Sequence, residues 1–342
     1  MRKLLNTLYV TLPEAYLAKD GENVVVRVDD EERFRIPIHN LEGIVSFGYP
    51  GASPALLGHC AQKGVAVTFL TEHGSFLAKV VGPVSGNVLL RRRQYRLADE
   101  EKESSRLATA FVAGKISNCR TVLQRALRDH KELEKEPLLT TINRLGGLIL
   151  DLEHCETLEE VRGIEGEAAK IYFSVFNYLV LTEKEHFHLR GRTRRPPRDN
   201  MNALLSFLYT LLRHDVVAAL ETVGLDPAVG FLHRDRPGRP SLALDLMEEL
   251  RPYMADRLAL TLVNRKQVEP SGFRQKETGG IYMHSETRKT VIAAWQKRKQ
   301  EQIIHPYLDE KIPIGLLPYV QAVLLARYLR GDIDGYPPFF WR

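Results

Sequence analysis

The chain has 342 residues, of which 44% are hydrophobic and 27% charged, a balance typical of soluble globular proteins. This length allows two domains with a sizeable core. No apolar run approaches the ~20 residues that span a bilayer, and polar residues follow the N-terminus too soon for a signal peptide. Cys60, Cys119 and Cys155 are isolated and odd in number, which favours reduced thiols of a cytosolic protein over disulfides or a zinc site.

The formal net charge is +5 and the pI is near 9.0, so the distribution of basic residues matters more than their sum. RRRQYR at 91–96 holds four arginines in six residues, and RGRTRRPPR at 190–198 holds five in nine. Either segment could be a solvated surface or could contact the phosphates of a nucleic acid. Two such clusters, both rich in arginine and one interrupted by Pro-Pro, favour nucleic acid.

The first 85 or so residues have the alternating pattern of β-strands. We expect a strand over 6–12, a hairpin over 16–28 turning near Asp20-Gly21, a strand ending near Pro37, a helix over Ser53–Lys63, and a hairpin over 65–82 turning at Glu72-His73-Gly74. This part of the chain therefore predicts a small β-rich domain.

After the first arginine segment the hydrophobic period becomes helical. Apolar residues recur at helical spacing from Ala98 to about Lys135, and the acidic DEEKE at 99–103 suits the first turn of a long helix. The remainder is mainly helical, apart from loops around 190–198 and 226–240. We therefore predict an α+β protein with a β-rich N-terminal dimerisation domain (1–88), a linker (89–97) and a larger all-α catalytic domain (98–342).

The segment GIEGEAAKIYF at 163–173 places two glycines inside a predicted helix, which begins after the capping box TLEE at 157–160. Gly163 and Gly166 each cost the helix about 1 kcal/mol relative to alanine. They flank Glu165. Small residues there would permit tight helix packing beside an exposed glutamate, or the close approach of a ligand to that carboxylate.

The segment GFLHRDRPGRPSLALDLMEELRP at 230–252 brings a histidine, His233, close to a predicted helix with Ser241 as its expected N-cap. Three acids at i, i+3 and i+4 form a ridge on this helix, namely Asp245, Glu248 and Glu249. The histidine and two carboxylates could bind Mg²⁺ or Mn²⁺. The alternatives are a hydrogen-bonded loop histidine and a solvated helix face.

The segment RPPRDNMNALLSFLYTLL at 195–212 predicts a helix capped by Asp199 or Asn200. Asn202, Ser206 and Tyr209 recur on one side of this helix. Such groups usually make local hydrogen bonds, but directly after an arginine loop they could also contact a nucleic-acid backbone.

These three segments, in this order and spacing, resemble the Cas1 family, the CRISPR-associated integrases of spacer acquisition. The resemblance covers essentially the whole chain, and residues 302–341 are similar to the subtype I-C branch. It implies a metal-dependent DNA endonuclease and integrase. Such an enzyme inserts short foreign DNA fragments into a CRISPR array by attack of a 3′-hydroxyl on a phosphodiester, as part of antiviral defence.

The resemblance also implies the site residues. The metal, Mg²⁺ or Mn²⁺, would be held by Glu165, His233 and Glu248, and Asp245 matches a further acid of the catalytic set. Many relatives carry aspartate at the position of Glu248, which leaves the ligand geometry open. DNA contacts are assigned to Arg190, Arg192, Arg194, Arg195, Asn202, Arg91 and Arg92.

The implied partners are double-stranded DNA, as prespacer and as CRISPR repeat, and a dimer of Cas2 that bridges Cas1 homodimers into a heterohexamer in the prokaryotic cytoplasm, with no membrane. Two other functions fit the residues less fully. One is a non-catalytic scaffold that holds nucleic acid through its arginines, and the other is a metal-dependent hydrolase of small phosphoesters.

Overall fold

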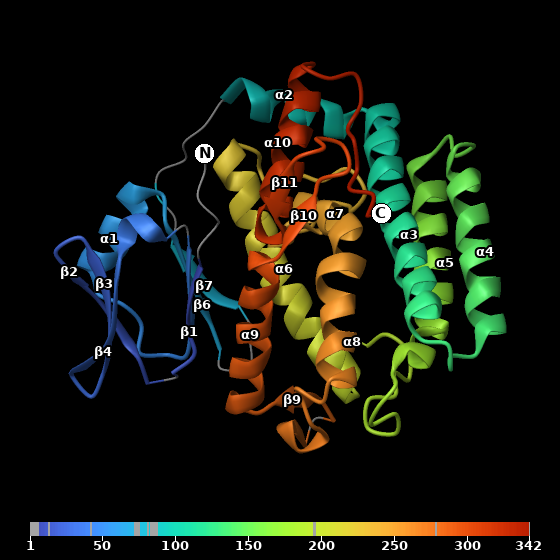
Figure 1. Ribbon diagram of the computed structural model, residues 1–342. Coiled ribbons are helices and arrows are strands. Elements are labelled where there is room, and N and C mark those ends of the chain that lie inside the picture. Colours follow the sequence, from blue (N-terminus) through green and yellow to red (C-terminus); the bar gives the residue numbers. More distant parts are fainter. Residues whose placement is uncertain are drawn as a thin grey trace. The chain divides into compact units, whose positions relative to one another are not determined.

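The computed structural model describes residues 7–12, 14–41, 43–71, 76–80, 82, 88–193, 196–277 and 279–341. The chain divides into two compact units, one of Met1–Gly86 with Met283–Ile292 and the other of Asn87–Tyr282 with Ala293–Arg342. The first is built mainly of strands and the second mainly of helices (Figure 1). The predicted α+β class, with a small β-rich region before a larger helical one, is therefore confirmed.

Two sheets form the first unit. One is antiparallel and contains β2 (Tyr16–Asp20), β3 (Asn23–Val28) and β4 (Glu31–Pro37). The other has the order β1 (Thr7–Val10), β5 (Gly43–Phe47), β6 (Ala66–Leu70) and β7 (Phe76–Val80); its first three strands are parallel, and β7 is antiparallel to β6.

Both predicted hairpins are present. The first is β2–β3, where Asp20 pairs with Asn23 and Gly21 adopts a φ of 56° that favours glycine. The second is β6–β7, whose predicted turn at Glu72-His73-Gly74 lies outside the described residues.

Helix α1 (Pro54–Lys63) lies where the sequence predicts a short helix. The Ser53 hydroxyl caps it by accepting a hydrogen bond from Leu56 N at 3.2 Å, and Gly64 ends it with a φ of 73°. Apolar side chains from both sheets and from α1 share one core, which includes Leu17, Val24, Ile38, Ile44, Cys60 and Val67.

The second unit is helical. Its helices are α2 (Val88–Asp99), α3 (Glu101–Asp129), α4 (Lys135–Leu152), α5 (Leu158–Ser174), α6 (Asn200–Val223), α7 (Ser241–Leu250), α8 (Arg257–Asn264) and α10 (Leu317–Arg330). Helix α9 (Ser285–Gln300) begins in the first unit and continues into the second. Short antiparallel pairs add β8 (Phe273–Gln275) with β9 (Ile281–Met283), and β10 (Gln302–Ile304) with β11 (Lys311–Pro313).

Two local expectations need correction. Residues 89–97, expected as a linker, form most of α2, because Leu90, Gln94 and Leu97 give this arginine-rich segment a buried face. Ser241 is the first residue of α7 and not its N-cap; its hydroxyl donates instead to Arg234 O at 3.2 Å.

The long helix α6 lies in the core of the second unit. Among the described residues it is the one helix long and apolar enough to cross a membrane, and 61% of its most apolar window is buried inside the protein. Such burial is typical of a core helix.

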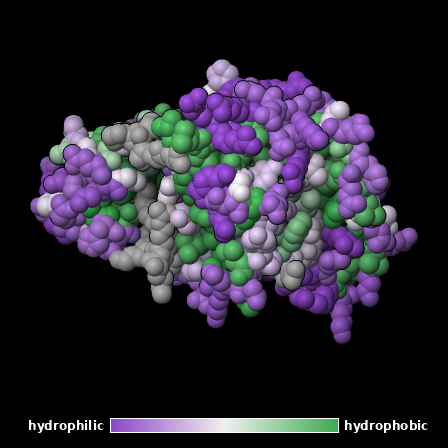
Figure 2. Space-filling view, turned by 90° about the horizontal axis from the view of Figure 1, so that it is seen from above, coloured by the Kyte–Doolittle hydropathy of each residue, from purple (hydrophilic) through white to green (hydrophobic). Residues whose placement is uncertain are grey.

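Polar side chains predominate on the surface seen in Figure 2.

Helix α3 positions the site. It packs against α4, α5 and α7, and Figure 1 shows α3, α4 and α5 side by side. Helix α5 begins with the predicted capping box, in which Glu160 N donates to the Thr157 hydroxyl at 3.3 Å and Thr157 N donates to Glu160 Oε2 at 3.0 Å. This cap sets where α5 begins and hence which of its residues face α3.

Candidate active site

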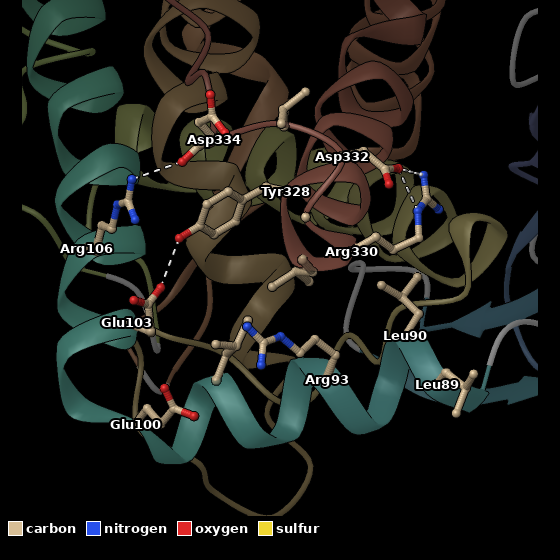
Figure 3. A pocket seen from close by; sticks show the side chains of 14 residues that line it. Leu89, Leu90, Arg93, Glu100, Glu103, Arg106, Tyr328, Arg330, Asp332 and Asp334 are labelled. Carbon is tan, nitrogen blue, oxygen red and sulfur yellow. Dashed lines mark hydrogen bonds and ion pairs between the residues drawn. The ribbon is translucent and has the colours of Figure 1, made fainter.

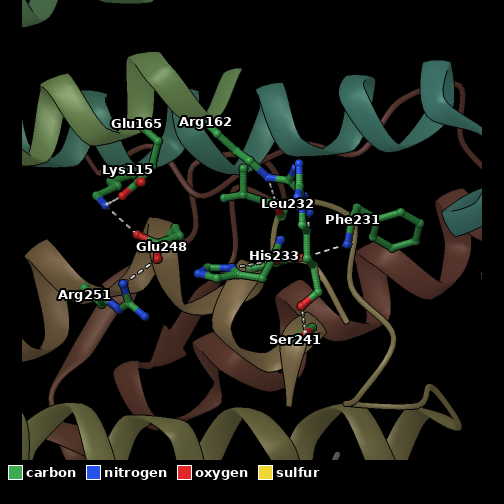
Figure 4. Close-up of polar contacts among 11 residues, drawn as sticks. Lys115, Arg162, Glu165, Phe231, Leu232, His233, Ser241, Glu248 and Arg251 are labelled. Atoms are coloured by element: carbon green, nitrogen blue, oxygen red, sulfur yellow. Dashed lines mark hydrogen bonds and ion pairs between the residues drawn. The ribbon is translucent and has the colours of Figure 1, made fainter. Parts of the chain in front are cut away.

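Three helices bring two predicted acids to one lysine (Figure 4). Lys115 of α3 donates a hydrogen bond to Glu165 Oε1 of α5, and its Nζ lies 2.7 Å from Glu248 Oε2 of α7. On the other side of Glu248, Arg251 Nη1 donates to Oε1. The side chain of Glu165 is 28% exposed, whereas those of Lys115 and Glu248 are 9% and 2% exposed. One carboxylate therefore faces solvent while the other is buried between two cations.

These cations control the ionisation of Glu248. Burial alone would raise the pKa of its carboxyl, but Arg251 and Lys115 outweigh burial and lower the pKa to about 2. Burial likewise works against the charge of Lys115, yet Glu248 and Glu165 raise the pKa of its ammonium. Both groups are therefore charged at neutral pH.

Asp245 of α7 fixes the loop that carries His233. Its carboxylate accepts hydrogen bonds from the backbone nitrogens of Phe231, Leu232 and His233 at 2.6, 3.0 and 3.0 Å. It also lies 2.6 Å from His233 Nδ1. Because Nδ1 is engaged by Asp245, Nε2 is the ring nitrogen left to meet a ligand or a proton. The imidazole of His233 points toward Glu248 and Lys115 in Figure 4.

Gly230 is required by this arrangement. A Cβ at this position would lie 2.7 Å from Asp245 Oδ2 and 2.8 Å from the backbone carbon of Ser241. No side chain can therefore stand where the loop crosses the start of α7.

The acidic ridge of α7 is not solvated. Measured over the whole residue, Asp245, Glu248 and Glu249 are each at most 1% exposed, which rules out the solvated-face alternative. Unlike Asp245 and Glu248, Glu249 contacts the C-terminal part of the chain. It accepts hydrogen bonds from Gln321 Nε2 at 3.0 Å and Phe339 N at 2.6 Å, and from the Tyr336 hydroxyl. Burial raises the pKa of its carboxyl to about 7, against the effect of these bonds. Glu249 therefore ties the C-terminal segment to the helix that carries the site.

The glycines around Glu165 lie at an open surface. A Cβ at Gly163 or Gly166 would meet nothing within 4 Å, so tight helix packing is not the reason for them. Among the described residues, no neighbouring helix therefore packs tightly against these glycines. The remaining interpretation is that small residues leave room for a ligand to approach the Glu165 carboxylate.

The second arginine segment folds around Asn202 of α6. Arg192 Nη1 donates to Asn202 Oδ1 at 2.6 Å, and Asn202 Nδ2 donates to Gly191 O and Asp199 Oδ2 at 2.8 and 2.6 Å. Asn202 has no exposed surface, so its amide holds this loop and is not an exposed DNA contact. Arg190 is exposed.

The remaining predicted DNA contacts are placed as follows. Arg194 and Arg195 lie outside the described residues. Arg91 and Arg92 lie on α2, where Arg92 is exposed and Arg91 half-buried. Helix α2 is anchored by Gln94, whose Nε2 donates to two backbone oxygens of the 226–229 loop at 2.8 Å. The chain continues from that loop to Gly230 and His233.

The donor set fits a hard divalent cation in its chemistry. Two carboxylates and an imidazole suit Mg²⁺ or Mn²⁺, and Glu165 and Glu248 already face one cation, the Lys115 ammonium. No group of three His, Cys, Asp or Glu side chains within the described ranges is close enough to hold a metal ion.

Lys115 and Arg251 were not identified from the sequence. A signal for Lys115 exists, because it interrupts the apolar face of α3 between Phe111 and Cys119, both buried. A lysine at a position that helical spacing assigns to the core needs a buried acid as partner. The identity of that partner depends on the tertiary structure.

A cavity of about 730 Å³ lies elsewhere in the second unit, between α2, the start of α3 and the end of α10 (Figure 3). Its polar lining includes Arg93 and Glu103, and the Tyr328 hydroxyl donates to Glu103 at 3.0 Å. None of the predicted catalytic or metal-binding residues line it.

Comparison with known sequences agrees with the resemblance. The family model of CRISPR associated protein Cas1 matches residues 8–297. A protein of Chlorobaculum tepidum named CRISPR-associated endonuclease Cas1 1 is 57% identical over 343 residues, covering 100% of both chains. CRISPR-associated endonuclease Cas1 2 of Rhodospirillum rubrum is 50% identical over 347 residues, again covering 100% of both.

Solved structures share the fold at low sequence identity. A CAS1 protein from Thermotoga maritima matches with a TM-score of 0.83 and 23% identity over 95% of this chain and 97% of that one. A casposase bound to integration product matches with a TM-score of 0.85 and 20% identity over 98% and 94%. A chain of a Cas6-RT-Cas1–Cas2 complex matches with a TM-score of 0.84 and 23% identity, over 100% of this chain and 36% of that one. The full-length sequence identities and the family match together show that this chain belongs to the Cas1 family of CRISPR-associated proteins.

Proposed function

We propose that this chain is a metal-dependent DNA endonuclease and integrase. It joins the 3′-hydroxyl of a short foreign DNA fragment to a phosphodiester of a CRISPR array. Full-length identity of 57% to a CRISPR-associated endonuclease supports this proposal. The observation that carries it is the convergence of Glu165 and Glu248, from helices far apart in sequence, on one cation beside the His233 imidazole.

The residues divide the chemical work. Glu165, Glu248 and the Nε2 atom of His233 would hold Mg²⁺ or Mn²⁺. When bound, the divalent cation supplies Lewis-acid stabilisation of the phosphate charge and orients the attacking hydroxyl. Arg251 keeps the Glu248 carboxylate ionised and fixed in direction. Asp245 holds the imidazole so that Nε2 is directed into the site, to bind the cation or to accept a proton.

DNA binding is assigned to the arginine segments. Arg92 and Arg190 are exposed and can contact phosphates directly. Arg91, Arg194 and Arg195 are further phosphate contacts by their place in the sequence, and Arg192 helps to shape its loop through Asn202. The substrate is double-stranded DNA, as prespacer and as CRISPR repeat.

In the proposed assembly, the two parts of the chain have different roles. Residues 1–88 act as the dimerisation domain and 98–342 as the catalytic domain. Strand β4 supports the first role, because it is an edge strand whose first five residues are exposed and can pair with a second copy. A Cas2 dimer bridges two such homodimers in the prokaryotic cytoplasm, and the chain belongs to subtype I-C.

A strand-transfer assay tests the function. Purified full-length protein would meet a labelled short duplex with 3′-hydroxyl ends and a supercoiled plasmid carrying a CRISPR repeat, in Mn²⁺, Mg²⁺ or EDTA, with and without a Cas2 protein. We expect metal-dependent joining by the wild type and a loss of about 100-fold or more in His233→Ala, because a group at the reacting centre is removed.

Fold and DNA binding of His233→Ala should match the wild type. His188→Ala, at an exposed histidine of the same unit, is the matched control and should join DNA normally. Binding of DNA without joining or nicking under any metal, even with Cas2, would favour the scaffold function. Faster turnover of small phosphoesters than of DNA would favour a phosphoester hydrolase.

A further inference from the structure

We propose that Lys115 is the internal counter-ion of the two active-site acids, and that a divalent cation enters the site by displacing the lysine ammonium from between them. Lys115 would thus be a positioning residue that sets the metal affinity. The inference rests on the proposed function, because it concerns the same carboxylates.

The Lys115 ammonium contacts both active-site acids at once. Lys115 Nζ contacts Glu165 Oε1 and lies 2.7 Å from Glu248 Oε2, so it contacts one oxygen of each acid (Figure 4). An ammonium within hydrogen-bonding distance of both oxygens occupies the space that a shared cation would need. Metal binding between the same two oxygens and the present position of Lys115 therefore exclude one another.

The acids of the site are already balanced in charge by basic side chains. Glu165 and Glu248 carry two negative charges, and Lys115 and Arg251 carry two positive charges. A divalent cation added to this balanced group would meet an ammonium at contact distance in a poorly hydrated place, because the lysine side chain is 9% exposed. Withdrawal of Lys115 removes that repulsion.

Only one of the two basic side chains needs to move. Arg251 binds the other oxygen of Glu248, and its guanidinium carbon lies 5.2 Å from the centre of the Tyr209 ring. It can therefore stay in place when Oε2 changes partner. The Lys115 ammonium is the end of a flexible four-carbon side chain. Its partner Glu165 is partly exposed, so the ammonium can move away from Glu248 on the solvent side of the site.

The arrangement has a consequence for the metal-free protein. A buried carboxylate without a counter-ion is costly, so Lys115 keeps Glu248 paired when no metal is bound. The same pairing competes with the metal and weakens its apparent affinity.

The test measures Mn²⁺ binding without DNA. Wild type and Lys115→Met would be titrated with MnCl₂ by calorimetry and by electron paramagnetic resonance of free Mn²⁺, and their Tm measured in EDTA and in Mn²⁺. We expect Lys115→Met to bind Mn²⁺ about tenfold more tightly or better. We also expect a lower Tm in EDTA and a larger rise of Tm on adding Mn²⁺. Lys170→Met, at an exposed lysine of α5, should match the wild type in each measurement.

A second measurement uses the wild type and so does not depend on the variant folding. Reductive methylation mapped by mass spectrometry should label Lys115 several-fold more in saturating Mg²⁺ than in EDTA, with Lys170 unchanged. Equal or weaker Mn²⁺ binding by folded Lys115→Met would overturn the inference. So would unchanged labelling of Lys115 at Mg²⁺ saturation. Strand transfer is not read in either measurement, so failure here is distinct from failure of the proposed function.

Discussion

At the scale of single residues, Asp245 does the most to shape the site without facing the proposed metal. Its two oxygens accept from three backbone nitrogens and contact His233 Nδ1. An amide at this position would keep one acceptor but turn a donor toward backbone N–H groups. The loop and the imidazole thus depend on a carboxylate and not only on a polar side chain.

We expect Asp245→Asn to lower the rate of strand transfer by about 10- to 100-fold and the stability by about 1–3 kcal/mol, because two donors are left facing each other and the imidazole loses its partner. Kinetics with MnCl₂ and thermal unfolding would measure both effects. Asp151→Asn, on the exposed surface of α4, is the control. Wild-type rates in Asp245→Asn would contradict the positioning role.

The raised pKa of the buried Glu249 carboxyl predicts that the stability of the protein depends on pH. Burial raises the pKa of its carboxyl from 4.5 to about 7 in the folded protein, so the folded state binds this proton more tightly than the unfolded state. Its contribution to stability is therefore complete below pH 4.5 and is lost as the pH rises through about 7. Glu248, whose pKa is lowered to about 2, contributes in the opposite sense and at lower pH.

We expect the stability of Glu249→Gln relative to wild type to improve by about 1–3 kcal/mol between pH 5 and pH 8, because the glutamine cannot ionise. Denaturant unfolding at several pH values would measure the difference. Glu167→Gln, at a half-exposed residue of α5, serves as the control. A stability difference that is independent of pH would show that Glu249 does not titrate as stated.

At the scale of elements, α2 is an arginine-rich helix that is held in a fixed position by its buried face. Leu90, Gln94 and Leu97 are buried, and Gln94 joins the helix to the loop before Gly230. Its exposed face carries Arg92. A mobile linker of the same sequence would have the same charge but no fixed position relative to His233.

We expect Arg92→Ala to weaken binding of duplex DNA uniformly across sequences and to reduce the slope of log K against log salt by about one, because one phosphate contact is lost. Fluorescence anisotropy at several salt concentrations would measure this. Arg128→Ala removes an exposed arginine of α3 outside both basic segments and is the matched control. Equal losses in the two variants would indicate a general charge effect instead of a contact.

At the scale of the whole molecule, the chain combines a β-rich unit with a helical unit that contains every described member of the predicted site. Within the helical unit, α3 contributes Lys115, and α5 and α7 each contribute one of the two acids that it contacts. Local signals predicted the elements well. The hairpin at Asp20-Gly21 and the capping box before α5 each depend on residues within a few positions of one another.

What the sequence alone determined is therefore the succession of elements and the fold class, and the family resemblance supplied the acids and the histidine of the proposed site. These follow from short-range periodicity, caps and motifs. The tertiary structure alone decided that α7 buries its acidic ridge, that Asp245 holds the His233 loop, and that Lys115 lies between Glu165 and Glu248. The physical reason is that the charge state and partner of a buried group depend on side chains 50 to 133 positions away in the sequence, as with Glu165 and Glu248 around Lys115, and only packing of the helices brings them together.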